Sequence, residues 1–586
     1  MMATPFTMKD LKAAIPTTSG TITVPGIDGS ITIFRDKYGI PHIQANTTKD
    51  AFFGQGFATS QDRLWHMEHD RRMAYGRWAE VVGDDAIEQD KLMRKLQIRS
   101  AVEIDYNILN DESRSMLDAY TAGVNAFLDR TNTLPVEFEI AGIKPDSWQP
   151  QDSLAIFTAR HILMGVFEGK LWRAQLINTL GVDKAAEIIP DYPTGHLLID
   201  PPGQNYTGGT WDVMAQLSAG AAGISWLADA EGGSNNWALM GSRTASGKPL
   251  VAGDPHRPLD TPNVYYQNHI ACPDFDAIGL SFPGCPGFPH FGHNAHVAWC
   301  VTHAQADYQD LYVERFKDGS LDYYEWKGNW RESDLRLETI RSKSGKKIDL
   351  EVIVTHHGSI IIDDPSSNYG IAFKHTGTSS PNNWSQCLPR MLRSRSANDM
   401  DEAMREWVDP GNNFVFADVN GNVEYLNRGR LPIRPDLNHW LPVPGSSGEY
   451  EWEGFVPFDE QVRIKNPEGG YIVTANNKIA PDSYPHYIAL HFSPEYRARS
   501  IKDMLDKLDK ATVEDMLSIH AAAISIPARI YMKLLEQIEP QDEISARGKS
   551  ELEGWDGTMD KNSIAPTIYS AFKRELEWML LEHHLG

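Results

Sequence analysis

The hydrophobic periodicity of the chain changes near its middle. A strand-like segment, ITIFRD, is followed by a capping signal at Thr47 and Thr48. From there apolar residues recur at helical spacings, and the pattern predicts a helix that continues to a C-cap at Gly83. Helical patterns then dominate to about residue 195, so the first part of the chain is predicted to be helix-rich.

After Ser234 the pattern becomes that of a sheet. Short β-like runs follow one another, and Asn420-Gly421 has the composition of a hairpin turn. The predicted strands lie in ALMG, PLVAG, VYYQNHI, DLYVERF, LEVIV and FVFADVNGNVEYL. Beyond Glu495 the helical periodicity returns and lasts to the end of the chain.

The small, glycine-rich segment between Pro201 and Gly233 separates these two textures. We therefore expect a helix-rich region over residues 1–200, a linker over 201–233 and a region with a sheet core and C-terminal helices over 234–586. The sequence contains no internal repeat.

Composition excludes several classes of function. Lys and Arg total 55 against 79 for Asp and Glu, a net charge of −24, which repels phosphate backbones and anionic lipid. We expect no nucleic-acid or membrane partner. The start of the chain has no apolar signal segment, so from sequence alone it reads as cytoplasmic. The 4 cysteines are irregularly spaced and are interpreted as buried thiols.

Ser234 follows two glycines in GGSNNW. If the Gly233-Ser234 bond were cut, Ser234 would carry both a hydroxyl and an α-amine with a pKa of about 7.7 to 8.0. Such an amine can accept the hydroxyl proton at neutral pH, so one residue would supply both nucleophile and base. GGS alone is also common in ordinary loops.

A predicted hairpin brings a histidine to this serine. ALMG runs outward, TASGK turns and PLVAGD returns, and a turn centred on residue 245 places Ser234 beside His256. The imidazole could then bond to the freed amine or to the hydroxyl.

Several segments, taken in order, resemble the penicillin amidase family of N-terminal-nucleophile hydrolases. The resemblance spans roughly residues 28 to 505 and rests on DKYGIPHIQANTTKDAFFGQGFATSQDRLWHMEHDRRMAYGRWAEVVG, GGSNNWALMGSRTASGKPLVAGDPH, FPGCPGFPHFGHNAHVAWCVTHAQAD, GGYIVTANN and EYRARSI. It implies an α+β fold with a four-layered αββα core and a helix-rich first chain. It also implies autoproteolysis between Gly233 and Ser234, which would give a heterodimer of α and β chains.

The resemblance further implies an acylase that cleaves a small-molecule amide through an acyl-enzyme. Relatives carry histidine or glutamine at the position of His256, and histidine is typical of the cephalosporin and homoserine-lactone acylases. A β-lactam or an acyl-homoserine lactone is therefore the expected kind of substrate. Relatives are often periplasmic or secreted.

The remaining site residues also come from the resemblance. The oxyanion donors would be the side chain of Asn476 and the backbone N–H of His303, with Asn477 as a rival for the first. Arg497 would orient the site. The reaction needs no cofactor, but Asp307 and Asp310 lie where relatives hold a structural calcium ion. Lys170 stands where relatives supply a further acidic ligand, and its ammonium could replace the calcium.

Two other functions compete with this interpretation. His290, His293 and His296 form H-x-x-H-x-x-H near His303, which raises the alternative of a zinc hydrolase. A family member that has lost activity and acts as a binding protein is the second alternative, because the chain ends earlier than its relatives usually do. Neither a GxSxG nucleophile elbow nor a phosphate-binding loop is present.

Overall fold

The structure is a computed structural model that describes residues 6–162, 164–181, 184–185, 232–317, 320–364, 368–379 and 381–585. The predicted linker therefore lies outside the described residues, apart from Gly232 and Gly233.

The first region is helical, as its periodicity predicts. Helix α2 (Thr48–Ala74) begins where the Thr47 side chain accepts a hydrogen bond from the N–H of Asp50. The predicted C-cap at Gly83 is confirmed, since α3 (Ala79–Val82) ends there, but Gly76 adopts a φ of +58° and divides the helical stretch into two helices. The other helices of the region are α1 (Met8–Ala13), α4 (Ile87–Lys95), α5 (Ile98–Ile108), α6 (Asp111–Leu128), α7 (Val136–Ala141), α8 (Pro150–Ile162) and α9 (Phe167–Leu180).

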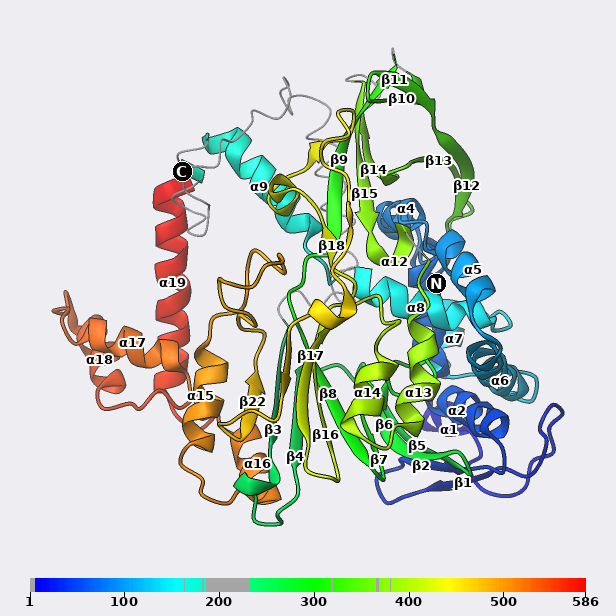
Figure 1. The fold of residues 1–586 in the computed structure, drawn as a ribbon, viewed down its shortest axis with the longest axis horizontal. Helices are drawn as coiled ribbons and strands as arrows, with labels where there is room; N and C mark the ends of the chain where they lie inside the picture. Colours follow the sequence, from blue (N-terminus) through cyan, green and yellow to red (C-terminus); the bar gives the residue numbers. More distant parts are fainter. Residues whose placement is uncertain are drawn as a thin grey trace.

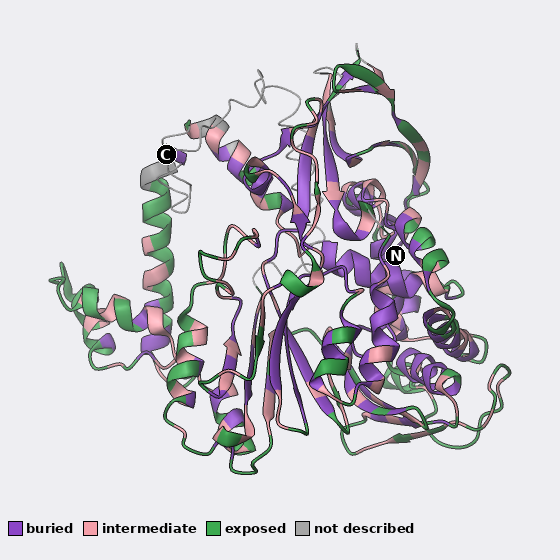
Figure 2. Cartoon of the chain, in the orientation of Figure 1, coloured by how far each residue is buried: buried purple, intermediate pink, exposed green. Residues whose placement is uncertain are grey.

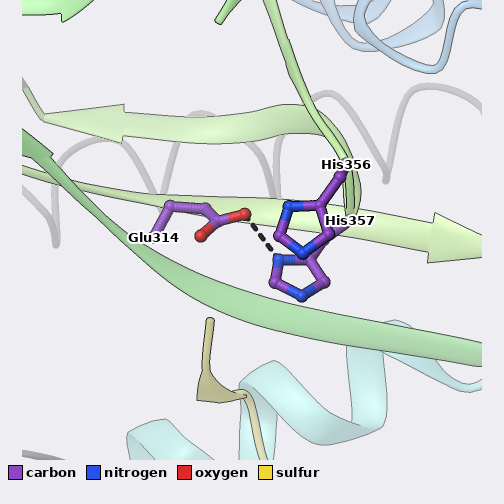
Figure 3. Close-up of side chains that lie close together, drawn as sticks. All are labelled: Glu314, His356 and His357. Carbon is purple, nitrogen blue, oxygen red and sulfur yellow. Dashed lines mark hydrogen bonds and ion pairs between the residues drawn. The ribbon is translucent and has the colours of Figure 1, made fainter. Parts of the chain in front are cut away.

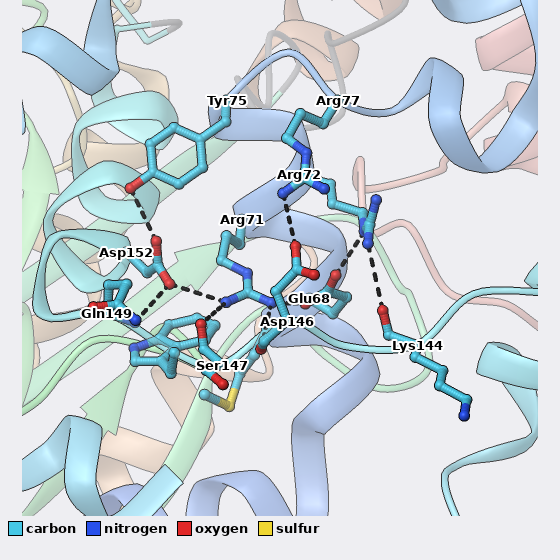
Figure 4. Close-up of polar contacts among 12 residues, drawn as sticks. Glu68, Arg71, Arg72, Tyr75, Arg77, Lys144, Asp146, Ser147, Gln149 and Asp152 are labelled. Atoms are coloured by element: carbon cyan, nitrogen blue, oxygen red, sulfur yellow. Dashed lines mark hydrogen bonds and ion pairs between the residues drawn. The ribbon is translucent and has the colours of Figure 1, made fainter. Parts of the chain in front are cut away.

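A buried network of charged groups fixes α2 against α8 (Figure 4). The guanidinium of Arg71 bonds to Glu68 and, at 3.0 Å, to Asp152 of α8, while Arg72 bonds to Glu68 at 2.6 Å. All four side chains are buried, and removal of one partner from such a network leaves an uncompensated charge. The helical layer is therefore held in one arrangement.

The largest sheet of the described residues has nine strands in the order β1-β2-β5-β6-β7-β8-β16-β17-β21. Its first two strands, β1 (Thr32–Arg35) and β2 (Pro41–Gln44), come from the helix-rich region, so the expectation that the sheets begin at Ser234 is wrong. Strand β2 pairs in parallel with β5, and two parallel neighbours can be joined only by a long connecting segment. The other strands are β5 (Tyr266–Cys272), β6 (Phe275–Ser281), β7 (Phe291–Asn294), β8 (Val297–His303), β16 (Asn412–Asp418), β17 (Val423–Arg428) and β21 (Arg463–Lys465).

A three-stranded sheet packs on the centre of this larger sheet. It consists of β22 (Tyr471–Thr474), β3 (Gly233–Leu239) and β4 (Leu250–His256), and both β3 and β4 contact β8 and β16. Helices α2, α13 (Cys387–Arg393) and α14 (Ala397–Ala403) contact the nine-stranded sheet, whereas α15 (Tyr496–Leu505) and α16 (Val513–His520) contact β22 and β4 (Figure 1). The predicted αββα layering is confirmed.

A further sheet of eight strands lies above these layers in Figure 1. Its order is β11-β10-β9-β15-β14-β13-β12, and β19 pairs with β9 in parallel. The strands are β9 (Gln309–Lys317), β10 (Ser320–Trp326), β11 (Asn329–Glu332), β12 (Asp334–Arg341), β13 (Lys347–Thr355), β14 (Gly358–Asp364), β15 (Tyr369–His375) and β19 (Val443–Pro444). The short helix α12 (Thr376–Ser379) follows β15, and β18 (Pro432–Ile433) pairs with β20 (Gly454–Phe455).

The degree of burial differs between the sheet core and the C-terminal helices (Figure 2). The strands around β8 and β16 are almost wholly buried, whereas the C-terminal helices α17 (Ile526–Leu535), α18 (Glu543–Leu552) and α19 (Ala565–Leu585) are largely exposed. None of the helices in the described ranges has the length and apolar content required to cross a membrane.

Candidate active site

Ser234 is the second residue of β3 and lies at the end of a buried strand. Its side chain is buried and lines a cavity of about 260 Å³, together with His303 and Asn476. The strand is held in place by its alternate side chains, since Trp237 and Leu239 pack against α15 and α16 on one face. Ser234 therefore sits on a rigid element at the wall of the cavity.

The asparagine beside Ser234 is Asn476. Its Nδ2 donates to the Oγ of Ser234 at 3.2 Å and to the carbonyl of His303 at 2.8 Å, and its Oδ1 accepts from the N–H of Ser234 at 2.9 Å. These partners fix which end of the amide is the oxygen. Asn476 has a φ of +62°, a conformation that asparagine tolerates better than most residues.

The rival asparagine has a different environment. The side chain of Asn477 accepts from the N–H of Ala475 at 2.9 Å and donates to the carbonyl of Lys478 at 3.2 Å. It shapes the local turn after β22, and the structure brings Asn476 rather than Asn477 to Ser234.

Arg497, in the first turn of α15, links the same groups. Its Nη1 donates to the carbonyl of Ser234 at 2.8 Å and to Oδ1 of Asn235 at 2.9 Å, and its Nη2 donates to Oδ1 of Asn476 at 2.9 Å. One planar guanidinium thus positions the serine backbone and the asparagine amide together.

The hairpin that carries His256 forms, but in a register that differs from the prediction by one residue. Gly233 pairs with His256, and Ser234 pairs with Pro255. The reason lies in the connection, which contains a short helical turn at Gly241–Arg243 and so is not symmetric about residue 245. Residues that pair directly share a face of the sheet, so His256 lies on the face of Gly233 and not on that of the Ser234 side chain.

His256 is nevertheless held next to the Gly233-Ser234 bond. Its Nε2 lies 3.0 Å from Oδ2 of Asp254 and 3.1 Å from Nδ2 of Asn235. Its Nδ1 would lie only 3.1 Å from a Cβ placed on Gly233. The imidazole is therefore oriented by a carboxylate on one side and faces Gly233 with its other nitrogen.

The backbone of His303 faces Asn476. Its carbonyl accepts from Asn476, while the N–H of the next residue, Ala304, donates to the Gly411 carbonyl at 3.1 Å. Because successive residues of a strand direct their backbone groups to opposite sides, we expect the N–H of His303 on the side of Asn476. The carbonyl of His303 also accepts from Nδ2 of Asn413, in β16, at 3.3 Å. Burial lowers the pKa of the His303 imidazole to about 4.

Two residues that the sequence analysis missed in this role also line the cavity. His161, from α8, and His290, just before β7, are buried, and desolvation lowers the pKa of both imidazoles well below its usual value. Their Nδ1 atoms have no hydrogen-bond partner among the described residues. His161 belongs to a helix whose residues from Asp152 to Ile162 are all buried, and no local pattern distinguishes it.

The histidines of the H-x-x-H-x-x-H motif do not converge. His290 is buried beside the cavity, whereas His293 and His296 are exposed. Within the residues that the structure describes, they form no group of three metal ligands, because alternate residues of a strand face opposite sides. The motif therefore does not support the zinc hydrolase alternative.

Asp307 and Asp310 are buried together with two cations. The Nζ of Lys170 lies 3.0 Å from Oδ2 of Asp307 and 2.7 Å from Oδ1 of Asp310. Arg434 approaches the same carboxylates at 2.8 and 3.1 Å. Burial alone would raise the pKa of Asp307, but Arg434 and Lys170 lower it below its usual value.

Comparison with known proteins identifies the family of the chain. The profile of the family described as penicillin amidase matches residues 30–586. The chain is 39% identical to "Penicillin acylase 2 proenzyme" of a Pseudomonas species, over 98% of this chain and 75% of that protein. It is 29% identical to "Acyl-homoserine lactone acylase QuiP" of Pseudomonas aeruginosa, over 98% of this chain and 71% of that protein.

One solved structure is similar over part of the chain. It is "Thermostable Penicillin G acylase from Alcaligenes faecalis in orthorhombic form", with 22% sequence identity and a TM-score of 0.48 over 56% of this chain and 60% of that one.

Proposed function

The chain belongs to the penicillin amidase family and is an amidohydrolase, and on that premise we propose that it cuts itself after Gly233 and hydrolyses amides through Ser234. The arrangement of Ser234, Asn476 and Arg497 carries this proposal. The hydroxyl and the backbone nitrogen of one serine both contact one asparagine amide, and an arginine holds both residues.

In the proposed maturation, Oγ of Ser234 attacks the carbonyl carbon of Gly233. The C–N bond breaks, the serine nitrogen takes up the proton, and water hydrolyses the resulting ester, which leaves a carboxylate on Gly233 and a free amine on Ser234. The crowding at Gly233 supports this assignment, since a Cβ there would lie 3.1 Å from Nδ1 of His256 and 3.2 Å from Nη2 of Arg497. Glycine is the residue that leaves these two groups in place.

In the proposed turnover, the free amine of Ser234 accepts the hydroxyl proton while Oγ attacks the substrate carbonyl. The amine product takes a proton and leaves, and water then releases the acyl group as an acid. The negative charge that develops on the carbonyl oxygen would be stabilised by Nδ2 of Asn476 and by the N–H of His303, and one such donor is worth about 3 to 4 kcal/mol.

We assign His256 to the amine rather than to the hydroxyl. The register of β3 and β4 places its ring on the face of Gly233, and Asp254 orients it through Nε2. The departure of Gly233 would leave Nδ1 free to contact the new amino terminus. An imidazole held in this way favours one tautomer, as a carboxylate-bound histidine usually does.

The substrate is proposed to be a small-molecule amide with an acyl group that fits the cavity beside Ser234. Relatives are named for penicillin and for acyl-homoserine lactones, so a β-lactam amide and an acyl-homoserine lactone are the two candidate classes. After self-cleavage, the α and β chains would remain together, because the helices of the first region pack on the sheet core.

We further propose that the Asp307–Asp310 pair does not bind calcium in this protein. Calcium requires several free oxygen ligands, whereas these carboxylates already bond to Lys170 and Arg434. Two buried cations balance two buried anions. The reaction proposed here uses no metal.

Substitution of Ser234 tests the function directly. Ser234→Ala should remain folded, stay a single chain and lose amide hydrolysis. If the variant hydrolysed amides at the wild-type rate, Ser234 would not be the nucleophile. If the wild-type chain were inert toward both substrate classes, the alternative of a binding protein would be favoured.

A further inference from the structure

A second group of chemically reactive side chains lies outside the serine site, in the eight-stranded sheet. His356 and His357 form the tight turn between β13 and β14, and Glu314 projects toward them from β9 (Figure 3). Glu451, from the segment after β19, completes the group by contacting both histidines. None of these residues lines the cavity of Ser234.

The two imidazoles converge on a single oxygen. Nε2 of His356 lies 3.2 Å and Nε2 of His357 lies 3.0 Å from Oε1 of Glu451. Four zinc ligands arranged as a tetrahedron at bond lengths of 2.0 to 2.2 Å are separated by about 3.3 to 3.6 Å. Each histidine nitrogen therefore already lies at close to this spacing from Oε1 of Glu451.

The opposite nitrogens of both rings are held by separate groups. Nδ1 of His357 lies 2.7 Å from Oε1 of Glu314, and Nδ1 of His356 lies 3.1 Å from the hydroxyl of Tyr324. A carboxylate or another oxygen on the second nitrogen is the usual means of orienting a metal-binding histidine. Each ring is thus turned so that its Nε2 faces Glu451.

Ion pairing alone leaves part of this group unsatisfied. Glu314 is fully buried, and its Oε1 takes hydrogen bonds from both Thr355 and His357. Its Oε2 has no partner among the described residues. Burial of a charged carboxylate that bonds to a histidine carries a large desolvation penalty unless a further positive charge lies nearby.

We propose that His356, His357 and Glu451 bind one divalent transition metal ion of the zinc type, with Glu314 and Tyr324 as the groups that orient the two histidines.

The surroundings suit such an ion. The side chains of His356 and Glu451 are each 26% exposed, so the ion can enter and water can fill the remaining position. Trp326 donates to the same Oε1 of Glu451 at 2.9 Å, and Lys374 lies 4.0 Å from Oε2, so both groups hold the carboxylate with Oε1 toward the histidines. The bound ion would link the β13–β14 turn to the segment after β19 that contains Glu451.

Calorimetric titration of the purified full-length protein with zinc, after removal of bound metal, tests the proposal. We expect one ion per chain, and His356→Gln and Glu451→Gln should each weaken binding at least tenfold. His293→Gln, which alters an exposed histidine of the other sheet, is the control and should bind as wild type. Absence of one-to-one binding, or unchanged binding by His356→Gln, would overturn the site.

A variant outside the ligand set separates a metal site from a simple ion network. Tyr324→Phe removes the partner of His356 Nδ1 and should weaken zinc binding by about 10-fold to 100-fold, as loss of such a partner does elsewhere. Cobalt in place of zinc should give the visible absorption of a four-coordinate ion. If Tyr324→Phe bound zinc as wild type, the geometry proposed here would be wrong.

Amide hydrolysis measured on the same samples keeps this inference separate from the proposed function. Removal of the ion should leave hydrolysis unchanged, because the group lies outside the serine cavity. A loss of activity on chelation that zinc restores would contradict a purely structural ion.

Discussion

Asn476 contacts Ser234 with both ends of its amide: Oδ1 accepts from the serine N–H at 2.9 Å, and Nδ2 donates to the serine Oγ at 3.2 Å. Before any bond is cut, the atoms that would become the amine and the hydroxyl of the nucleophile are thus held by one side chain. The same Nδ2 is the proposed donor to the oxyanion, so Asn476 connects maturation with turnover.

Removal of the Asn476 amide should slow turnover by roughly 10² to 10³ in processed protein, because one oxyanion donor is lost. Asn476→Gly is the suitable change, since glycine tolerates the φ of +62° at this position. The rate should be measured on the cleaved fraction, with folding checked by circular dichroism.

Asn477→Ala is the matched control, because that side chain bonds only to its own turn. It should retain turnover within a few-fold of wild type. If Asn477→Ala were the slow variant and Asn476→Gly were not, the assignment of the donor would be reversed.

Gly233→Ala should delay self-cleavage by about tenfold or more. The added methyl group would meet Nδ1 of His256 and the guanidinium of Arg497 at 3.1 to 3.2 Å, and displacement of packed groups costs about 1 to 3 kcal/mol. The fraction of cleaved chain over time, read from denaturing gels, measures the effect. Gly469→Ala is the control, since a Cβ there meets nothing within 4 Å.

The sequence predicted the layers of the fold better than the fine register. The β-like runs ALMG and PLVAG on either side of the TASGK turn predict the β3–β4 hairpin, and Thr47 predicts the start of α2. The pairing of Gly233 with His256 could not be counted from the sequence, because the turn between the strands contains a helical segment whose length depends on local hydrogen bonds. A slip of one residue moves a side chain to the other face of a sheet.

Some residues of the candidate site come from segments that are far apart in the sequence, and no local sequence pattern predicted them. His161 reaches the cavity from α8, and Arg434 reaches Asp307 from a loop after β18. Both depend on how the helical layer and the sheets pack together, which hydrophobic periodicity does not encode. The Glu314–His357 contact likewise joins strands that are separated along the chain.

Lys170→Met should lower the free energy of unfolding by about 3 to 5 kcal/mol, because it leaves Arg434 alone to balance two buried carboxylates. Urea denaturation measures the change, and Lys502→Met, at an exposed ion pair, should unfold like wild type.

Added calcium should not shift the urea midpoint of the wild-type protein. A clear stabilisation by calcium would show that the carboxylates bind the ion after all.

The protein should lose stability as the pH falls below about 6.5, the unperturbed pKa of histidine. Burial lowers the pKa of His375 to about 3, so in this window the unfolded chain binds a proton that the folded chain does not. The stabilising contribution is complete above pH 6.5 and is lost as the pH falls through the folded pKa.

His375→Asn tests this dependence, since the amide oxygen can still accept from the N–H of Gly377, as Nδ1 does at 3.0 Å. The variant should show a shallower fall in urea midpoint between pH 6.5 and 4, whereas the exposed His293→Asn should follow wild type. Identical slopes for His375→Asn and wild type would remove His375 as the cause.

Intact-mass analysis of active protein, with sequencing of every amino terminus, tests whether Ser234 becomes the amino terminus of a second chain. Wild-type protein should consist of two chains, one of which begins Ser-Asn-Asn-Trp at Ser234, and Ser234→Ala should be a single uncleaved and inactive chain. One unbroken chain with full amide-hydrolysing activity would contradict it.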